Sequence, residues 1–226
     1  MGRAERENSY MDAVIFDMDG VLFDTERMCM DAWSQVAKKR GIAGMDDVAR
    51  SCIGLNANDT RKLVLSHYGE DFAYDDFRNA VSSWMNTRIK IYGLPVKPGV
   101  GRLLEYLKHK EIPVGLASST GYASVLSHLK NAGIVDNFQV IITGDMIEHS
   151  KPSPDIYVLA CRKLGAVPSR AYAIEDSPNG IRSAYSAGLK PILVPDMIEP
   201  DDEIRSKSFR IFDDLIQVMR FFQEIA

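Results

Sequence analysis

The chain has 226 residues, of which 46% are hydrophobic and 26% are charged, as in an ordinary globular protein. This composition excludes a disordered chain, a collagen-like chain and a coiled-coil rod. The net charge of −4 gives no electrostatic reason to expect nucleic acid or an anionic membrane as a partner. No apolar run approaches the ~20 residues of a membrane span, and the polar first ten residues lack the apolar region of a secretory signal.

Cysteine usage indicates the compartment. The three cysteines are Cys29, Cys52 and Cys161, and no C-x-x-C pair occurs. An odd number of scattered cysteines is typical of reduced thiols and not of a disulfide framework. We therefore expect a cytoplasmic protein. The sequence leaves the oligomeric state open, a monomer included.

Short apolar runs that end at polar residues recur along the chain, and amphipathic helical patterns separate them. Continuous apolar runs of this length suit strands that are buried on both faces of a parallel sheet. The alternation of strand and helix predicts an α/β fold, with a Rossmann-like core built on a parallel sheet. Ser153 and Ser177, each followed by proline, are expected to cap two of the helices. The expected strands are 13–16, 112–117, 140–142, 171–174 and 191–194, and the expected helices begin near residues 100, 122, 154, 178 and 215.

Residues 27–93 break this alternation. Their apolar spacing predicts three helices and no strand. The chain then returns through the proline- and glycine-rich segment 93–99, which is typical of a hinge. We therefore expect a core domain formed by residues 10–26 and 94–226, with a helical cap domain, 27–93, inserted after the first strand.

Acidic residues follow two of the expected strands. Asp17 and Asp19 follow the first strand, and Glu175 and Asp176 follow the fourth. Ligands of open parallel sheets bind at the carboxyl ends of the strands, so these four groups should converge. Crowded carboxylates remain ionised together only when a cation offsets their charge. An all-oxygen set of ligands indicates a hard cation such as Mg²⁺.

Groups that suit a phosphate lie at the same expected edge. Ser118 and Ser119 follow the second strand, and Lys151 lies after the third. Hydroxyl and ammonium groups are the partners that a phosphate needs. One carboxylate of the Asp17 and Asp19 pair could attack phosphorus, and the other could serve as general acid and then base.

Each of these residues also has an alternative interpretation. A calcium loop beginning at Asp17 would need glycine at its sixth position, where this chain has Leu22. No G-x-x-x-x-G-K-[ST] segment occurs, so a P-loop nucleotide site is not supported. Lys151 could instead be a solvated surface lysine, and Ser118 could merely cap the helix that follows it.

Four segments together resemble the motifs of the haloacid dehalogenase superfamily. Residues 17–26 match the first motif, D-x-D-G-x-x-x-D-[ST], and residues 115–118 look like the second, an apolar strand ending in Ser or Thr. Residues 150–155 and 174–181 are similar to the third and fourth motifs. The ordered set spans most of the chain. The helical insert is similar to the cap of the subgroup that contains β-phosphoglucomutase and phosphoglycolate phosphatase.

The resemblance implies a role for each matching position. Asp17 would be the nucleophile, and Asp19 would be the acid and base and would bind Mg²⁺ through its backbone carbonyl. Asp176 would bind Mg²⁺ directly, and Glu175 would bind it directly or through water. The expected magnesium ligands are thus Asp17, Asp19, Glu175 and Asp176, and the expected phosphate-binding residues are Ser118, Ser119 and Lys151.

The resemblance implies a Mg²⁺-dependent phosphatase that acts on a small phosphorylated metabolite, with sugar phosphates as the expected class, through an aspartyl phosphate. Two alternatives stay open: a phosphomutase like β-phosphoglucomutase and a non-catalytic module that binds sugar phosphates. The mutase carries a histidine in its first cap helix where this chain has Cys29, and an arginine that is missing after Gly54. Both departures favour the phosphatase. Substrate selection is expected in the cap around residues 52–58, with Gly54 and Asn56 as candidate contacts.

Overall fold

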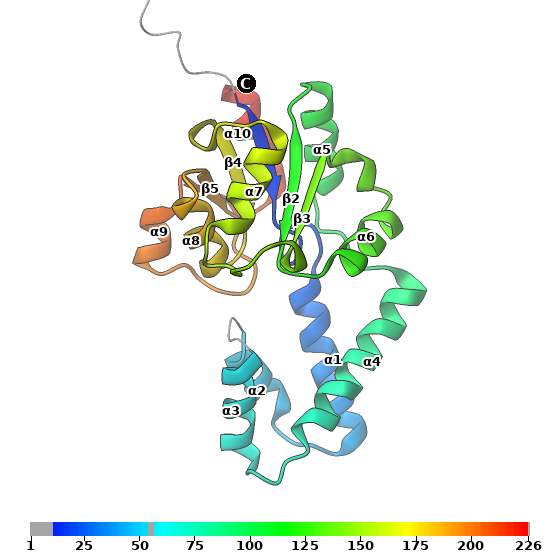
Figure 1. The fold of residues 1–226 in the computed structure, drawn as a ribbon. Coiled ribbons are helices and arrows are strands. Elements are labelled where there is room, and N and C mark those ends of the chain that lie inside the picture. The colour runs from blue at the N-terminus through cyan, green and yellow to red at the C-terminus, as the bar shows by residue number, and fades with distance from the viewer. Residues whose placement is uncertain (1–10, 54–56, 226) are drawn as a thin grey trace, which may run out of the picture. The chain divides into compact units, whose positions relative to one another are not determined.

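The computed structural model describes residues 11–53 and 57–225 (Figure 1). The described residues form two compact units. One unit combines the described residues up to Phe23 with those from Val96 onward, and the other contains the described part of Asp24–Pro95. No helix among the described residues is both long enough and apolar enough to span a membrane.

The first unit contains a six-stranded parallel sheet with the strand order β3-β2-β1-β4-β5-β6. The chain therefore builds outward from a central β1 in both directions, which is the order of a doubly wound sheet. The predicted α/β fold with a parallel sheet is confirmed. The strands are β1 (Ala13–Phe16), β2 (Val114–Ser118), β3 (Val140–Thr143), β4 (Ala171–Glu175), β5 (Lys190–Leu193) and β6 (Arg210–Ile211).

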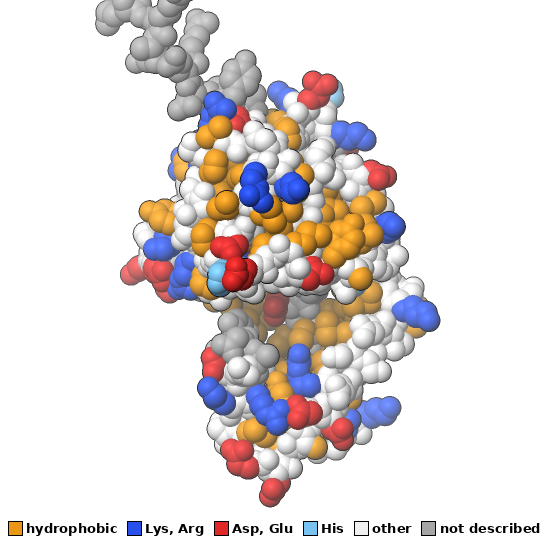
Figure 2. All heavy atoms as spheres, viewed as in Figure 1, with side chains coloured by type: hydrophobic (Ala, Val, Ile, Leu, Met, Phe, Trp, Pro, Cys, Tyr) orange, Lys and Arg blue, Asp and Glu red, His pale blue; other side chains and the backbone are white. Residues whose placement is uncertain are grey.

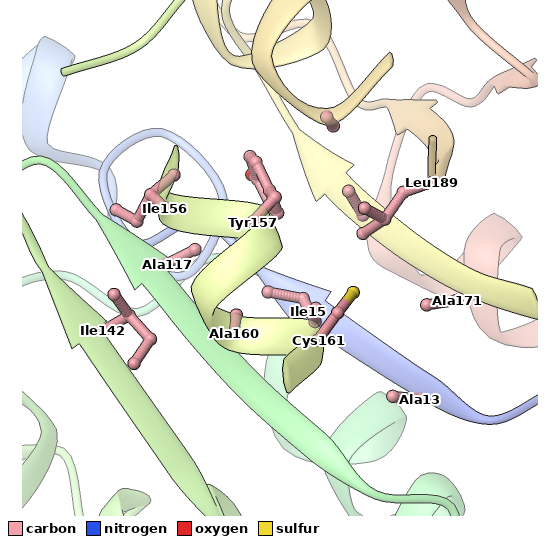
Figure 3. Close-up of a cluster of buried hydrophobic side chains, with 12 residues drawn as sticks. Ala13, Ile15, Ala117, Ile142, Ile156, Tyr157, Ala160, Cys161, Ala171 and Leu189 are labelled. Carbon is pink, nitrogen blue, oxygen red and sulfur yellow. The ribbon is translucent and has the colours of Figure 1, made fainter. Parts of the chain in front are cut away.

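Helices cover both faces of this sheet because side chains alternate across each strand. Ala171 and Ala173 of β4 belong to the cluster of buried residues around α7, whereas the Tyr172 ring between them lies 5.3 Å from that of Phe222 in α10. Figure 3 shows the first cluster, where side chains of α7 such as Tyr157 gather over the strands. The helices of this unit are α5 (Val100–His109), α6 (Tyr122–Asn131), α7 (Asp155–Leu164), α8 (Pro178–Ser186), α9 (Asp202–Lys207) and α10 (Leu215–Ile225), with 3₁₀ turns η1 (Val135–Asn137), η2 (Gly144–Met146) and η3 (Pro168–Arg170).

The two predicted serine caps have different outcomes. Ser177 caps α8, because its hydroxyl accepts a hydrogen bond from the Gly180 amide at 3.1 Å. The cap predicted at Ser153 is wrong, since the hydroxyl of this serine lies 2.6 Å from the Asp155 carboxylate and α7 begins without a side-chain cap. The helix begins one residue later than predicted, with Pro154 at the N-cap position, so Ser153 precedes that position and its hydroxyl donates to Asp155.

All regular elements in the described part of the second unit are helices. The three predicted helices are present, and α2 is an additional short one. The unit has its own core. The rings of Trp33 and Phe77 meet edge to face in it, with their centroids 5.3 Å apart, and the fully buried Val64 belongs to the same cluster. The helices are α1 (Thr25–Arg40), α2 (Met45–Ser51), α3 (Ala57–Tyr68) and α4 (Tyr74–Tyr92).

Candidate active site

The carboxyl ends of three neighbouring strands bring the predicted polar residues of the core together. Strand β1 pairs with β2 on one side and with β4 on the other, so that Phe16 faces Leu116 and Ile174. Asp17 follows directly after β1, while Ser118 and Glu175 are the last residues of β2 and β4. Parallel strands end at the same edge of the sheet, which is why residues far apart in sequence meet there.

Lys151 joins these three strands. Its ammonium group donates hydrogen bonds to the Asp17 Oδ1 at 2.5 Å, to the Glu175 Oε1 at 2.6 Å and to the backbone carbonyl of Ala117 at 2.9 Å. The Lys151 side chain is only 7% exposed. The alternative that this residue is a solvated surface lysine is therefore wrong. Burial alone would lower the pKa of Lys151, but the two carboxylates outweigh it, so the pKa is raised and the side chain stays charged.

Three carboxylates form a compact cluster beside this lysine. Asp17, Glu175 and Asp176 each offer an oxygen atom, and these atoms lie within 4.8 Å of one another. Burial raises the pKa of Asp17 to about 8, with Lys151 opposing the rise and Glu175 adding to it. Burial, followed by the charges of Asp17 and Glu175, likewise raises the pKa of Asp176 well above its ordinary range. The single Lys151 charge does not offset three carboxylates, and their oxygen donors fit a divalent cation.

Asp19 has different surroundings from Asp17. Its Oδ2 accepts a hydrogen bond of 2.9 Å from the hydroxyl of Thr120, and its side chain is outside the carboxylate cluster. The two aspartates that lie two residues apart in sequence therefore have separate partners, one an ammonium group and the other a hydroxyl.

Two glycines make room for the carboxylates. Gly20 has a φ of +80°, and a Cβ atom there would lie 2.0 Å from the Oδ2 of Asp176. A Cβ atom on Gly180 would lie 1.9 Å from the Oε2 of Glu175. Any side chain at these positions would displace a carboxylate of the cluster.

The two predicted serines differ in exposure. Ser118 is fully buried, and its hydroxyl accepts a hydrogen bond of 3.1 Å from the Thr120 amide, whereas Ser119 is exposed. Ser118 does not cap α6, because the N-cap residue of that helix is Gly121 and no side chain caps it. The Tyr122 amide in its first turn donates instead to the Asp145 carboxylate at 3.2 Å.

Two residues that touch the site were not predicted from the sequence. Thr120 donates to Asp19, and it stands in the polar run that follows β2, which was the available signal. Tyr157 donates a hydrogen bond of 2.6 Å to the Glu175 Oε1, and its ring lies 5.2 Å from the Lys151 ammonium. Tyr157 stands on the apolar face of α7, where nothing in the sequence distinguishes it from an ordinary core residue.

The predicted cap contacts Gly54 and Asn56 lie outside the described residues. The helical unit does contain a pocket of about 350 Å³. Burial raises the pKa of the Cys29 thiol in its wall, so this thiol stays neutral near pH 7. The lining includes Glu26, Cys29, Trp33, Thr60, Tyr74 and Arg78.

Comparison with known proteins identifies the family of the chain. The chain is 34% identical over 182 residues to a phosphorylated carbohydrates phosphatase of Thermotoga maritima, covering 80% of this chain and 84% of that protein. It is 32% identical over 187 residues to the β-phosphoglucomutase of Bacillus subtilis, covering 79% and 81%. The crystal structure of CbbY from Rhodobacter sphaeroides in complex with phosphate superimposes with a TM-score of 0.70 at 26% identity, covering 92% of this chain and 96% of that one. Residues 14–194 match the family of haloacid dehalogenase-like hydrolases, and the chain belongs to that family.

Proposed function

We propose that this hydrolase is a Mg²⁺-dependent phosphatase for small phosphorylated metabolites, with phosphorylated carbohydrates as the substrate class. The observation that carries the proposal is the buried Lys151 ammonium, which bonds to Asp17 and Glu175 beside the third carboxylate, Asp176. This arrangement supports the proposal, because one carboxylate would attack phosphorus beside a positive charge that would hold the phosphoryl oxygens. The similarity to a phosphatase of phosphorylated carbohydrates supports the same class of substrate.

In the first half of the reaction Asp17 is the nucleophile. Its carboxylate oxygen forms a bond to phosphorus while the bond from phosphorus to the ester oxygen breaks, which leaves an aspartyl phosphate. Asp19 gives its proton to the departing oxygen, so that a neutral alcohol leaves. Lys151 and Ser118 hold the phosphoryl oxygens during the transfer. Thr120 keeps the Asp19 carboxyl in place through its hydrogen bond of 2.9 Å.

In the second half Asp19 acts as the base. It removes a proton from a water molecule, whose oxygen bonds to phosphorus as the bond to Asp17 breaks. Phosphate leaves, and both aspartates return to their starting protonation states. The separate hydrogen-bond partners of Asp17 and Asp19 support this division of roles.

The carboxylate cluster would hold the cation. Asp17 and Asp176 would bind Mg²⁺, Glu175 would bind it directly or through water, and Asp19 would contribute its backbone carbonyl. A divalent cation is general in this family, and its charge would offset the crowded carboxylates and the phosphate. The all-oxygen donor set supports Mg²⁺ among the possible ions.

We also propose that residues 27–93 act as a cap domain that selects the substrate, with Gly54 and Asn56 among its contacts. The protein would act in the cytoplasm, and the three free thiols of Cys29, Cys52 and Cys161 support that location. The reaction needs no partner other than the small phosphorylated substrate, and all its proposed residues belong to one chain.

A phosphomutase is the second candidate, because the chain is 32% identical to a β-phosphoglucomutase. The neutral Cys29 thiol argues against it, since this position carries a histidine in the mutase family and a neutral thiol is a poor proton donor near pH 7. The two activities separate when β-glucose 1-phosphate is supplied with Mg²⁺ and catalytic glucose 1,6-bisphosphate. Glucose 6-phosphate without free phosphate would support the mutase, and free phosphate at each turnover supports the phosphatase.

The direct test of the proposed function is a panel of phosphorylated metabolites. Release of free phosphate is measured with Mg²⁺ and again with excess EDTA. We expect turnover of sugar phosphates that EDTA abolishes and added Mg²⁺ restores. Full activity in excess EDTA, or no hydrolysis of any phosphate ester, would contradict the proposal.

A further inference from the structure

Lys97 ties together three loops at the carboxyl edge of the sheet. Its ammonium donates a hydrogen bond of 2.8 Å to the backbone carbonyl of Gly20, which follows β1, and another of 2.8 Å to the Asp196 carboxylate, which follows β5. The side chain of Asp196 is 2% exposed and that of Lys97 is 16% exposed. A charge pair buried to this degree costs desolvation free energy, and stability alone seldom explains it.

The main chain of Lys97 holds the same turn. The Lys97 amide donates to the Leu22 carbonyl at 2.9 Å, so the residue grips the turn after β1 through both its backbone and its side chain. The turn is closed internally, because the amides of Leu22 and Phe23 both donate to the Met18 carbonyl. Lys97 therefore fixes a small rigid loop, and that loop carries Asp19.

This loop lies directly against the carboxylate cluster. A Cβ atom on Gly20 would lie only 2.0 Å from the Oδ2 of Asp176, so the Gly20 backbone forms a wall of the Asp176 site. Gly20 is itself buried, and bulk water cannot replace the ammonium as the partner of its carbonyl. A shift of this turn by a fraction of an ångström would move Asp19 and the wall beside Asp176 together.

We propose that Lys97 is a positioning residue for the active site: by linking the Gly20 carbonyl to Asp196, it holds the turn that carries Asp19 against Asp176. The inference rests on the proposed function, in which Asp176 binds Mg²⁺ and Asp19 is the acid and base. Groups that orient metal ligands from outside typically contribute 10- to 100-fold to metal affinity or activity.

The test compares Lys97→Met with the double variant Lys97→Met/Asp196→Leu. Mg²⁺ affinity is measured by calorimetry without substrate, and kcat and KM are measured with p-nitrophenyl phosphate. In Lys97→Met we expect Mg²⁺ affinity and kcat each to fall by about 10- to 100-fold, with little change in KM. The double variant also removes the buried Asp196 charge that has lost the Lys97 ammonium, and it should regain thermal stability. It should not regain Mg²⁺ affinity or kcat, because the Gly20 carbonyl still lacks its donor.

Arg170→Met is the matched control. Arg170 also forms an ion pair in this unit, with Asp12 at 2.9 Å, but Asp12 directly precedes β1 and so lies at the opposite, amino end of the strands. We expect this variant to keep the Mg²⁺ affinity and kcat of the wild-type protein. Conservative replacement Lys97→Arg keeps a cationic donor and should recover part of both losses.

Each result decides the inference. If Lys97→Met keeps the Mg²⁺ affinity and kcat of the wild-type protein, the positioning role is overturned and the ion pair is structural only. If Lys97→Met does not fold, the same result in the double variant overturns the positioning role. Failure of the wild-type protein to bind Mg²⁺ would instead contradict the proposed function, and the inference with it. The calorimetric measurement on the wild-type protein separates the two cases.

Discussion

The hydroxyl of Tyr157 donates a hydrogen bond of 2.6 Å to the Glu175 Oε1, the same oxygen that accepts a hydrogen bond from Lys151. Glu175 is fully buried, and so is Tyr157. Burial and the neighbouring charge of Glu175 raise the pKa of Tyr157 well above its ordinary value, so its hydroxyl keeps its proton near neutral pH and donates. A side chain of helix α7 therefore holds the Glu175 carboxylate of the site in place.

The first prediction concerns this hydrogen bond. Tyr157→Phe removes the donor and leaves the ring, so the free energy of unfolding should fall by about 1.5–3 kcal/mol, as for hydrogen bonds to charged groups. Urea unfolding measures the loss. Tyr185→Phe is the control, since Tyr185 is 53% exposed and should lose little. If the two substitutions lower the free energy of unfolding equally, the buried hydrogen bond of Tyr157 does not stabilise the fold.

The second prediction is a pH dependence of stability without metal. The folded chain raises the pKa of Asp17 from its ordinary 3.8 to about 8. The folded state therefore binds more protons than the unfolded state between these values, and stability should fall as the pH rises from about 4 to 8. Lys151 titrates above this window and does not alter the sign. A bound divalent cation should reduce the slope, because it favours the ionised carboxylates.

Denaturant unfolding at pH 5 and pH 8, in EDTA and in Mg²⁺, measures this slope. Asp17→Asn should reduce the slope in EDTA, since asparagine does not titrate, and the raised pKa of Asp176 should leave part of the fall in place. Stability that rises between pH 5 and pH 8 in EDTA would contradict the raised pKa of Asp17.

The third prediction concerns Asp19. Loss of the general acid in Asp19→Asn should slow substrates with poor leaving groups by about 10²- to 10⁴-fold. Hydrolysis of p-nitrophenyl phosphate should fall less, because nitrophenolate leaves without a proton. The two losses are measured as kcat/KM for a sugar phosphate and for p-nitrophenyl phosphate, because kcat/KM reports the steps up to the aspartyl phosphate and leaves out the later attack of water, in which Asp19 is the base. Identical losses would show that Asp19 does not protonate the leaving group.

The fourth prediction tests substrate selection by the helical insert. Arg78 lines the pocket of this unit, so Arg78→Met should change the ranking of metabolites in the phosphatase panel. Hydrolysis of p-nitrophenyl phosphate should stay nearly intact. Arg50→Met, which breaks an exposed ion pair with Asp47 in the same unit, should change neither property. If Arg78→Met loses the same share of activity on every substrate, the insert has a structural role and does not select the substrate.

The sheet was predictable because its strands are buried on both faces. Strand β1 is entirely buried and reads as a continuous apolar run. Strand β6 has two residues, Arg210 and Ile211, and one of them is exposed, so no run marks it. Helices α2 and α9 have seven and six residues, which is too short for a helical period to repeat clearly.

The convergence of polar groups was predictable to the extent that they stand at strand ends. Asp17, Ser118 and Glu175 end or follow apolar runs, and parallel topology brings such positions together. The supporting contacts were not predictable, because each joins residues far apart that lie in unremarkable surroundings. Lys97 stands 99 positions before Asp196 in a segment that resembles a hinge, and only the folded chain reveals the bond between them.

The most direct test of the account is phosphate release from p-nitrophenyl phosphate by Asp17→Asn in the presence of Mg²⁺. In the proposed mechanism an oxygen of the Asp17 carboxylate is the nucleophile that bonds to phosphorus. Among the described residues, Glu175 is the one other carboxylate that accepts a hydrogen bond from Lys151. The account predicts that Asp17→Asn loses turnover to the background rate while its circular dichroism spectrum matches that of the wild-type protein. Turnover of the folded variant at the wild-type rate would contradict the account.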